Sequence, residues 1–283
     1  MLATKDNPNP AAPRSKRKWR RPGRLGAFIY IVLGFFFVNF FVQIYRKPTE
    51  LLRFAKLGRS KTPQETWDEF GEDFRRHATD VITADFLAAL VQAESSGDTL
   101  ASPAWTWHWS TSPWRLYGPP STAVGLLQIT KGNFGVARTF CVQDGRVARE
   151  GPWYDRDACK FTGLYSRLVA SHSIEMTSAF LHYNVQKIVG RSSRRVSLRD
   201  KQKLAAVIHL CGPNKGPALV RSRFDADALG SCGTQPVGSY VRVVMKYRAQ
   251  FSQLAAAETE EPVLRIASVS RPRTTLTSAI SSR

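Results

Sequence analysis

The sequence is short of the residues from which metal and redox sites are built. It has four cysteines, none spaced as C-x-x-C. Its five histidines show no metal-ligand spacing either; they are His77, His108, His172, His182 and His209. Structural zinc sites place Cys and His ligands at short, regular intervals. We therefore expect no metal ion and no cofactor.

Basic residues are scarce where an enzyme acting on nucleic acid would need them. The net charge of the chain is +19, but residues 62–261 contribute only +3 of it. Residues 1–61 contribute +12 and residues 262–283 contribute +4. Because a nucleic-acid enzyme concentrates basic residues on its working domain, we expect no nucleic-acid partner.

Charged residues are absent from Leu25 to Tyr45, an apolar run of the length that a membrane helix needs. A cleaved signal peptide is disfavoured because Val42-Gln43-Ile44-Tyr45 offers no small-residue cleavage site. Seven basic residues between positions 14 and 24 precede the run, against four between 46 and 56. This bias favours a cytoplasmic N-terminus.

The cysteines, Cys141, Cys159, Cys211 and Cys232, all follow the apolar run. Four cysteines allow three connectivities, and the local pairings Cys141–Cys159 and Cys211–Cys232 would each contribute roughly 3 kcal/mol in the chain-entropy model. Buried free thiols and a zinc site are the alternatives. Disulfides need an oxidising compartment, so we favour disulfides and a periplasmic or extracytoplasmic domain.

Changes in composition and helix-boundary signals divide the chain into five segments, and no internal repeat is found. Thr62-Pro63-Gln64-Glu65 indicates a helix start with a capping box. The predicted segments are a basic disordered cytoplasmic tail (1–24), a transmembrane signal anchor (25–45), a basic linker (46–61), a globular domain (62–257) and a disordered tail (258–283).

A second helix is predicted to begin after Thr83 and to end near Ser95-Ser96-Gly97-Asp98. Leu87, Leu90, Val91 and Glu94 share one face of it, so a carboxylate ends an apolar stripe. Burial would raise the pKa of such a carboxyl, which suits a general acid. The alternative is that Glu94 turns outward at the helix end.

Two segments in this order resemble the paired signature of the soluble lytic transglycosylase (SLT) catalytic-domain family. They are Glu94-Ser95-Ser96-Gly97 and Gly125-Leu126-Leu127-Gln128-Ile129-Thr130. Tyr240-Val241-x-x-Val244 is similar to the last motif of the family, and residues 174–181 resemble its intervening core helix. The resemblance covers roughly residues 80 to 250. It implies an all-α, goose-type-lysozyme-like fold behind the single transmembrane helix.

The resemblance also implies a chemistry that needs one carboxylate. Glu94 would protonate the oxygen leaving N-acetylmuramic acid (MurNAc) at its β-1,4 bond to N-acetylglucosamine (GlcNAc), then accept the O6 proton of the same MurNAc. Attack by that hydroxyl would give a 1,6-anhydro product. The implied substrate-binding residues are Ser95, Ser96, Gly125, Gln128 and Tyr240, with Tyr240 positioning the acid. The missing second carboxylate fits this mechanism, since most glycosidases use two.

The sequence departs from the family pattern in two places. Leu210 stands where the family has an asparagine that helps to arrange the catalytic site. His209, where the family often has tyrosine, is expected to be a core histidine, with a place in the site as the alternative. An aromatic insertion at 103–120 could stack on sugars, sit at a membrane interface or form a small core; its aromatics are Trp105, Trp107, Trp109, Trp114 and Tyr117.

These expectations combine into a membrane-anchored lytic transglycosylase that acts on peptidoglycan glycan strands. Two alternatives stay open. A hydrolytic muramidase would need a carboxylate to activate water, and Asp98, Asp144, Asp155 and Asp157 are better explained by turns and a loop. A non-catalytic scaffold in an envelope complex, with a partner that the sequence does not identify, is favoured by Leu210 and disfavoured by the presence of both Glu94 and Gln128.

Overall fold

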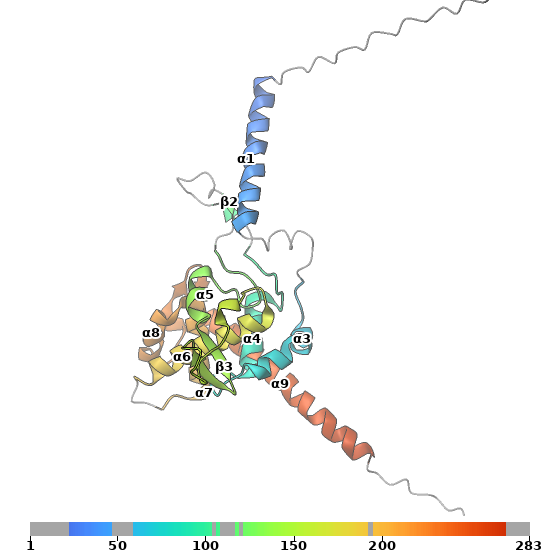
Figure 1. Cartoon of the computed structure of the whole chain (residues 1–283), viewed down its shortest axis with the longest axis vertical. Coiled ribbons are helices and arrows are strands. Elements are labelled where there is room, and N and C mark those ends of the chain that lie inside the picture. Colours follow the sequence, from blue (N-terminus) through green and yellow to red (C-terminus); the bar gives the residue numbers. More distant parts are fainter. Residues whose placement is uncertain are drawn as a thin grey trace, which may run out of the picture.

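The structure is a computed structural model of the whole chain, and it describes residues 23–46, 59–103, 106–107, 117–118, 121–191 and 195–269. Helices dominate these residues (Figure 1). In chain order the α-helices are α1 (Arg24–Arg46), α3 (Pro63–Arg76), α4 (Ala84–Ser95), α5 (Lys131–Ala137), α6 (Ala170–Val189), α7 (Leu198–Cys211), α8 (Gly216–Arg221) and α9 (Val237–Val269).

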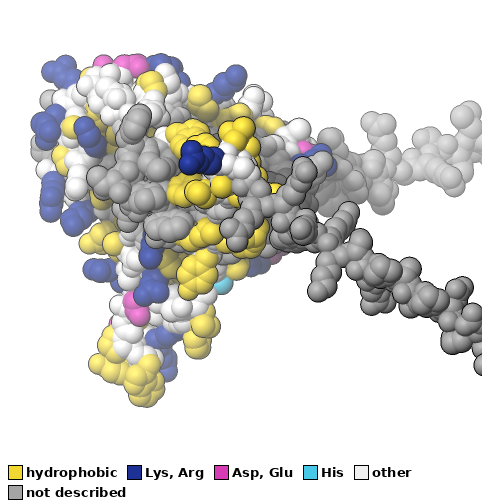
Figure 2. Space-filling view, turned by 90° about the horizontal axis from the view of Figure 1, so that it is seen from above, with side chains coloured by type: hydrophobic (Ala, Val, Ile, Leu, Met, Phe, Trp, Pro, Cys, Tyr) yellow, Lys and Arg dark blue, Asp and Glu magenta, His cyan; other side chains and the backbone are white. Residues whose placement is uncertain are grey.

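Helix α1 is the expected apolar helix, and among the described residues it alone is long and apolar enough to cross a membrane. It projects away from the other helices (Figure 1), and its apolar side chains, such as Leu25, Phe28 and Phe37, are largely exposed. In the view from above, hydrophobic side chains gather near the middle of this face while Lys and Arg side chains lie mostly around it (Figure 2). A helix with so much exposed apolar surface needs an apolar environment.

Helix α3 begins as the sequence predicts. Thr62 is the N-cap, Pro63 is the first helical residue, and the Thr62 and Glu65 side chains each bind the other residue's backbone N–H. The apolar side chains of Trp67, Phe70 and Phe74 are buried as expected. This stripe packs α3 against α4 and α9.

Helix α4 lies at the centre of the domain. Every residue from Phe86 to Val91 is completely buried, on all faces of the helix. A helix that is apolar all round must be surrounded by other elements, and α3 and α9 pack along it. The small Ala88 and Ala89 side chains leave room for these neighbours at close range.

Helices α6, α7 and α8 complete the helical layer around this core. Ile174, Met176 and Leu181 of α6 are fully buried, in agreement with the predicted core helix at 174–181. Helix α7 packs against both α6 and α9, with Leu204 and the neighbouring Ala205 and Ala206 facing the interior. Short 3-10 turns connect the helices: η2 (Thr162–Leu164), η3 (Pro213–Lys215) and η4 (Asp227–Leu229).

The strands form three antiparallel pairs, each of two short strands. They are β1 (Thr106–Trp107) with β2 (Tyr117–Gly118), β3 (Phe140–Gln143) with β4 (Arg146–Arg149), and β5 (Ser231–Cys232) with β6 (Gln235–Pro236). The first pair lies in the aromatic insertion. The β3–β4 hairpin packs against α6 through Phe140 and Val142.

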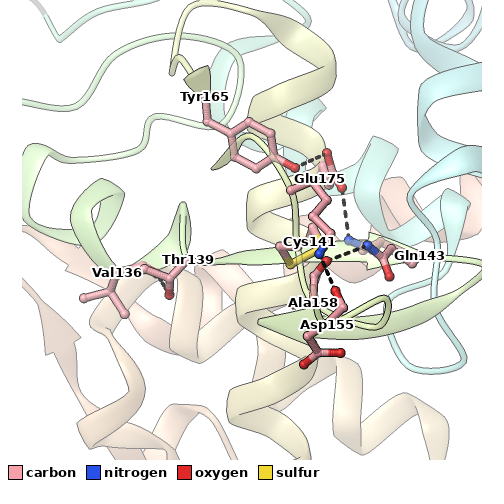
Figure 3. The surroundings of a disulfide bond; sticks show 11 residues. Val136, Thr139, Cys141, Gln143, Asp155, Ala158, Tyr165 and Glu175 are labelled. Atoms are coloured by element: carbon pink, nitrogen blue, oxygen red, sulfur yellow. Dashed lines mark hydrogen bonds between the residues drawn. A yellow bond between two sulfur atoms is a disulfide. The ribbon is translucent and has the colours of Figure 1, made fainter. Parts of the chain in front are cut away.

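Both expected disulfides are present, Cys141–Cys159 and Cys211–Cys232. The first ties β3 to the loop after β4 (Figure 3). The second ties the end of α7 to β5. Each therefore staples an irregular segment to a regular element.

The predicted C-terminal boundary of the domain at residue 257 is too early. Helix α9 continues to Val269, and the Glu258 carboxylate accepts hydrogen bonds from Trp67 Nε1 at 3.0 Å and Arg75 Nη1 at 2.8 Å. The run 255–258, Ala-Ala-Ala-Glu, is made of strong helix formers that extend the helix to these contacts. Residues 270–283 of the predicted tail lie outside the described residues.

The linker boundary also shifts, because Lys61 belongs to the domain. Its backbone N–H donates to Ser96 O, and its ammonium group donates to Gly97 O at 2.8 Å. The predicted tail at 1–22 and most of the linker, 47–58, lie outside the described residues. The chain is thus a helix-rich domain together with one long apolar helix near its N-terminus.

Candidate active site

Glu94 lies in the last turn of α4, at the end of the buried stripe formed by Leu87, Leu90 and Val91. The helix ends because Ser96 adopts a left-handed conformation (φ 51°) as its C-cap. The Glu94 side chain is 17% exposed. It therefore sits at the edge of the core, and the alternative that it turns freely outward does not describe it.

Two side chains from other helices converge on one oxygen of Glu94. The Tyr240 hydroxyl, in the first turn of α9, donates a hydrogen bond to Oε1. His209 Nε2, near the end of α7, lies 3.4 Å from the same Oε1. Among the described residues, Glu94 Oε2 makes no hydrogen bond or ion pair. One carboxyl oxygen is thus held, and the other is left for a ligand.

His209 is the residue that the sequence analysis misjudged. Its side chain is 12% exposed, so it is buried as expected, but its ring faces Glu94 rather than serving only the core. The signal was its position in the third family motif, where a tyrosine is usual. Spacing along α7 could not reveal the contact, because it joins helices more than a hundred residues apart in the sequence.

The pKa of Glu94 is shifted in the direction opposite to the prediction. Burial raises the pKa of Glu94, as the sequence analysis argued. The contact with His209 and the hydrogen bond from Tyr240 act the other way, and together they hold this pKa below its ordinary value. The apolar stripe on α4 predicted that Glu94 is buried. It could not predict the opposite effect on the pKa, because His209 and Tyr240 come from α7 and α9.

Tyr240 shows the reciprocal effect. It is nearly fully buried, and burial together with the charge of Glu94 and the hydrogen bond to it raise the pKa of Tyr240 well above its usual range. The tyrosine therefore keeps its proton and remains a donor to Glu94 at physiological pH. The positioning role implied for Tyr240 by the family resemblance fits this contact.

The segments that carry His209 and Tyr240 are fastened to each other. The Cys211–Cys232 disulfide begins two residues after His209 and leads through β5 and β6 into α9. Arg242 forms two hydrogen bonds of 2.7 Å with Asp227 of η4. Gly238 lies so close to Asp227 that an added Cβ would meet it at 1.8 Å. These contacts therefore fix the first turn of α9, which carries Tyr240.

Ser95 and Ser96, expected to bind substrate, are engaged within the protein. The buried Ser95 hydroxyl donates to Val91 O at 3.1 Å, one turn back along its own helix. The Ser96 carbonyl accepts the Lys61 backbone N–H. The Ser-Ser-Gly part of the motif thus ends α4 and attaches the start of the domain.

Gly125 and Gln128 form a turn that is held by the protein itself. Gly125 has φ +80°, and an added Cβ would lie 2.3 Å from Arg167 O, so the glycine permits the close approach of this carbonyl. The Gln128 amide donates to Ala101 O at 2.8 Å and Gly125 O at 2.9 Å. These bonds account for both of its amide protons, and its carbonyl oxygen remains as the group with which Gln128 could orient a ligand.

Backbone hydrogen bonds link the two halves of the signature. Asp98 N–H donates to Ser95 O, Ala101 N–H to Asp98 O, and Gly125 N–H to Ala101 O. The Asp98 carboxylate accepts Leu100 N–H at 2.8 Å, which is the turn role expected for it. The segment after Glu94 and the Gly125 turn therefore form one connected scaffold.

Leu210, which replaces the family asparagine, packs against the hydrophobic core. It cannot supply a polar group to Glu94. Among the described residues, no second carboxylate contacts Glu94, and no cluster of three or more His, Cys, Asp and Glu could hold a metal ion.

Most of the aromatic insertion lies outside the described residues, including Trp105, Trp109 and Trp114; of Tyr117 only the backbone, in β2, is described. The Trp107 side chain is 66% exposed and makes an edge-on contact with Phe36 of α1 at 5.9 Å between ring centroids. This contact leaves the three interpretations of the insertion open.

A surface hollow of about 450 Å³ lies elsewhere, near the start of α3. Its lining residues are Arg59, Lys61, Glu65, Asp68 and Glu69. Arg59 pairs with Glu65, and Lys61 pairs with Glu69. Asp68 accepts a hydrogen bond from the Gln64 amide at 2.8 Å, and Glu94 is not among the lining residues.

Comparison with known proteins adds no relative: no family model, no curated protein and no solved structure matches the chain.

Proposed function

We propose that this protein is a peptidoglycan lytic transglycosylase of the SLT family with a goose-type-lysozyme-like fold, and that Glu94 is its catalytic acid and base. The observation that carries the proposal is the Glu94 carboxyl, which Tyr240 holds on Oε1 while Oε2 has no partner among the described residues. A single carboxyl suffices when the sugar's own O6 hydroxyl is the nucleophile. The enzyme would cleave the β-1,4 bond between MurNAc and GlcNAc and leave 1,6-anhydroMurNAc ends.

The proposed location follows from α1 and the disulfides. As a signal anchor, α1 would hold the protein in the bacterial inner membrane with its N-terminus in the cytoplasm. The disulfides Cys141–Cys159 and Cys211–Cys232 need an oxidising compartment, and this supports a periplasmic location for the domain. A reporter active only outside the cytoplasm, fused to the C-terminus of the full chain, should be active. Activity of a cytoplasmic reporter at the same position would contradict both location and substrate.

Product analysis tests the reaction. The full chain, in detergent, is incubated with purified sacculi, and the released muropeptides are identified by mass spectrometry. We expect 1,6-anhydro ends from the wild type and at least a ~10²-fold lower rate from Glu94→Gln, as is typical for the loss of a general acid–base group. Release of reducing ends would instead identify a hydrolytic muramidase.

A non-catalytic peptidoglycan-binding scaffold of an envelope complex is the second candidate, and Leu210 is the observation in its favour. The same experiment separates it, because a scaffold would bind sacculi without releasing any muropeptide. Leu210→Asn sharpens the test by restoring the family residue. A scaffold that lost activity through this position alone should gain product release in that variant.

A further inference from the structure

The contacts of Glu94 raise a question about proton supply that a single-carboxylate mechanism must answer. Glu94 has to give a proton first and take one back afterwards. His209 and Tyr240 hold its pKa below the ordinary value despite burial, so in the resting site the carboxyl is ionised near neutral pH. A proton must then reach Glu94 from a group beside it.

His209 is the group whose position fits this need. Its Nε2 is 3.4 Å from Glu94 Oε1, and histidine is the side chain that ordinarily exchanges protons between pH 5 and 8. Tyr240 is the other group on Oε1, but its raised pKa makes it a permanent donor rather than a proton source. Both neighbours leave Oε2 unengaged among the described residues.

We propose that His209 is the proton store of Glu94, a positioning residue that shares one proton with the carboxyl throughout the proposed transglycosylase cycle. The inference rests on the proposed function for its chemical steps. At rest the proton lies on His209 Nε2, and Glu94 is a carboxylate. When the glycan strand excludes water from the site, the proton passes from Nε2 to the Glu94 carboxyl. Nε2 is then an acceptor, and Tyr240 remains the donor to Oε1.

The steps balance without a further reactant. In the first step the Glu94 carboxyl protonates the glycosidic oxygen as the bond from this oxygen to the MurNAc C1 breaks, and the bonding electron pair leaves with the oxygen. The pair then carries no proton. In the second step O6 of MurNAc bonds to C1, and its proton returns to Glu94 and then to His209. The pair ends with the one proton with which it began.

Few other groups among the described residues act on the Glu94 carboxyl. His209 from α7 and Tyr240 from α9 are the groups that shift the Glu94 pKa. The ion pair between α4 and α9, Asp85 with Arg248, lies more than two helical turns away along each helix. A change in how the site responds to pH can therefore be traced to His209.

Two substitutions of His209 separate proton storage from space filling. His209→Gln keeps a hydrogen-bonding side chain of similar size that does not titrate. His209→Tyr introduces the residue that the family often has there, which also does not titrate between pH 5 and 8. The matched control is His182→Gln, since His182 is, like His209, a largely buried histidine in contact with a carboxylate, that of Asp80, but belongs to α6.

The first measurement is the pH profile of kcat/KM for muropeptide release from sacculi by the full chain. In the wild type, activity persists until the pair loses its shared proton as pH rises. Without His209 the proton rests on the carboxyl alone, so the alkaline limb should move to lower pH by at least about one unit. We expect about 10-fold or greater loss at pH 7.5 for both His209 variants, much of it recovered at acidic pH, and no shift for His182→Gln.

A rate that falls by the same factor at every pH would show a structural role and overturn the proposal. Neutral-pH activity restored by His209→Tyr would also overturn it, because tyrosine can fill the site but cannot store the proton. Unchanged thermal unfolding of the variants confirms that folded proteins are being compared.

The second measurement does not depend on peptidoglycan. The Glu94 carboxyl is titrated by carbon-13 NMR on the full chain in micelles, with Glu94→Gln identifying its resonance. Its pKa should rise in His209→Gln, because the interactions that lower it are lost while burial remains. An unchanged titration would sink the inference even if sacculi are cleaved. Conversely, failure of the wild type to release anhydro products would defeat the proposed function and leave this titration to test the pair alone.

Discussion

Two partly buried glutamates in this domain each accept a hydrogen bond from a tyrosine, and they differ in what their second oxygen does. Glu175 on α6 accepts Tyr165 O–H at 2.8 Å on Oε2 and Val142 N–H at 3.1 Å on Oε1, so both of its oxygens are used (Figure 3). Glu94 accepts Tyr240 O–H on Oε1, while Oε2 has no partner among the described residues.

The difference separates a structural carboxylate from one available for chemistry. Glu175 joins α6 to β3 and to the loop that carries Tyr165, beside the Cys141–Cys159 disulfide. Burial and the bond to Glu175 raise the pKa of Tyr165, as burial and Glu94 do for Tyr240. A tyrosine beside a glutamate is therefore not by itself the mark of an active site. The unengaged oxygen and the adjacent His209 distinguish Glu94.

The largest expected effect comes from replacing each of the two carboxylates. Glu94→Gln removes the transferable proton and should lower muropeptide release at least ~10²-fold, while binding to sacculi largely survives because the remote contacts remain. Glu175→Gln should retain the wild-type rate in folded protein, yet lower the free energy of unfolding by about 1–3 kcal/mol, since Val142 N–H loses a charged acceptor. The rates come from muropeptide release and the stabilities from chemical denaturation. Similar rate losses in the two variants would remove the distinction between them.

The next effect concerns the two disulfides. Replacing either pair of cysteines with serine should lower the free energy of unfolding by roughly 3 kcal/mol, because each disulfide closes a loop of similar length. Only the Cys211/Cys232 variant should also lose activity at temperatures where it remains folded, because that disulfide fixes the segments bearing His209 and Tyr240. Denaturation curves and activity at one low temperature measure both quantities. Equal activity in the two double variants would show that the Cys211–Cys232 bond does not set the site.

The elements of the fold that could be predicted are those that depend on residues close together in the sequence. The capping box at Thr62, the stripe of α4 and the apolar run of α1 each depend on residues within one or two turns. The continuation of α9 past residue 257 could not be found in this way, because Glu258 is held by Trp67 and Arg75 from the other end of the domain. Composition alone placed the boundary at the start of the polar tail.

The site follows the same division. Glu94 could be proposed from its place at the end of an apolar stripe, and Tyr240 from its motif. The direction of the Glu94 pKa shift could not be predicted, because it is decided by charge and hydrogen bonds that α7 and α9 bring across the fold. Ser95 and Gly125 show the opposite case. The motif implied that they bind substrate, but their contacts in the structure are with other parts of the chain.

The pH dependence of the free energy of unfolding tests the lowered pKa of Glu94. The pKa of Glu94 is lowered in the folded protein, so the ionised carboxyl contributes stability that is fully present above its unfolded value of about 4.5. That contribution is lost as pH falls through the folded value. The difference in unfolding free energy between wild type and Glu94→Gln should therefore shrink on acidification below about pH 4.5. A difference that stays constant from pH 7 to pH 3 would contradict the lowered pKa.

The smallest expected effect lies in the two tyrosines. Tyr165→Phe removes one hydrogen bond to Glu175 and should lower the free energy of unfolding by about 1 kcal/mol without changing the rate, because Val142 still holds the carboxylate. Tyr240→Phe removes the same kind of bond from Glu94, but His209 remains on the same oxygen, so the loss should appear mainly in kcat and not in KM. Chemical denaturation and muropeptide kinetics on both variants measure this. If Tyr165→Phe also lowered kcat, the Glu175 network would have to support the reacting groups, and the two glutamates could no longer be assigned separate roles.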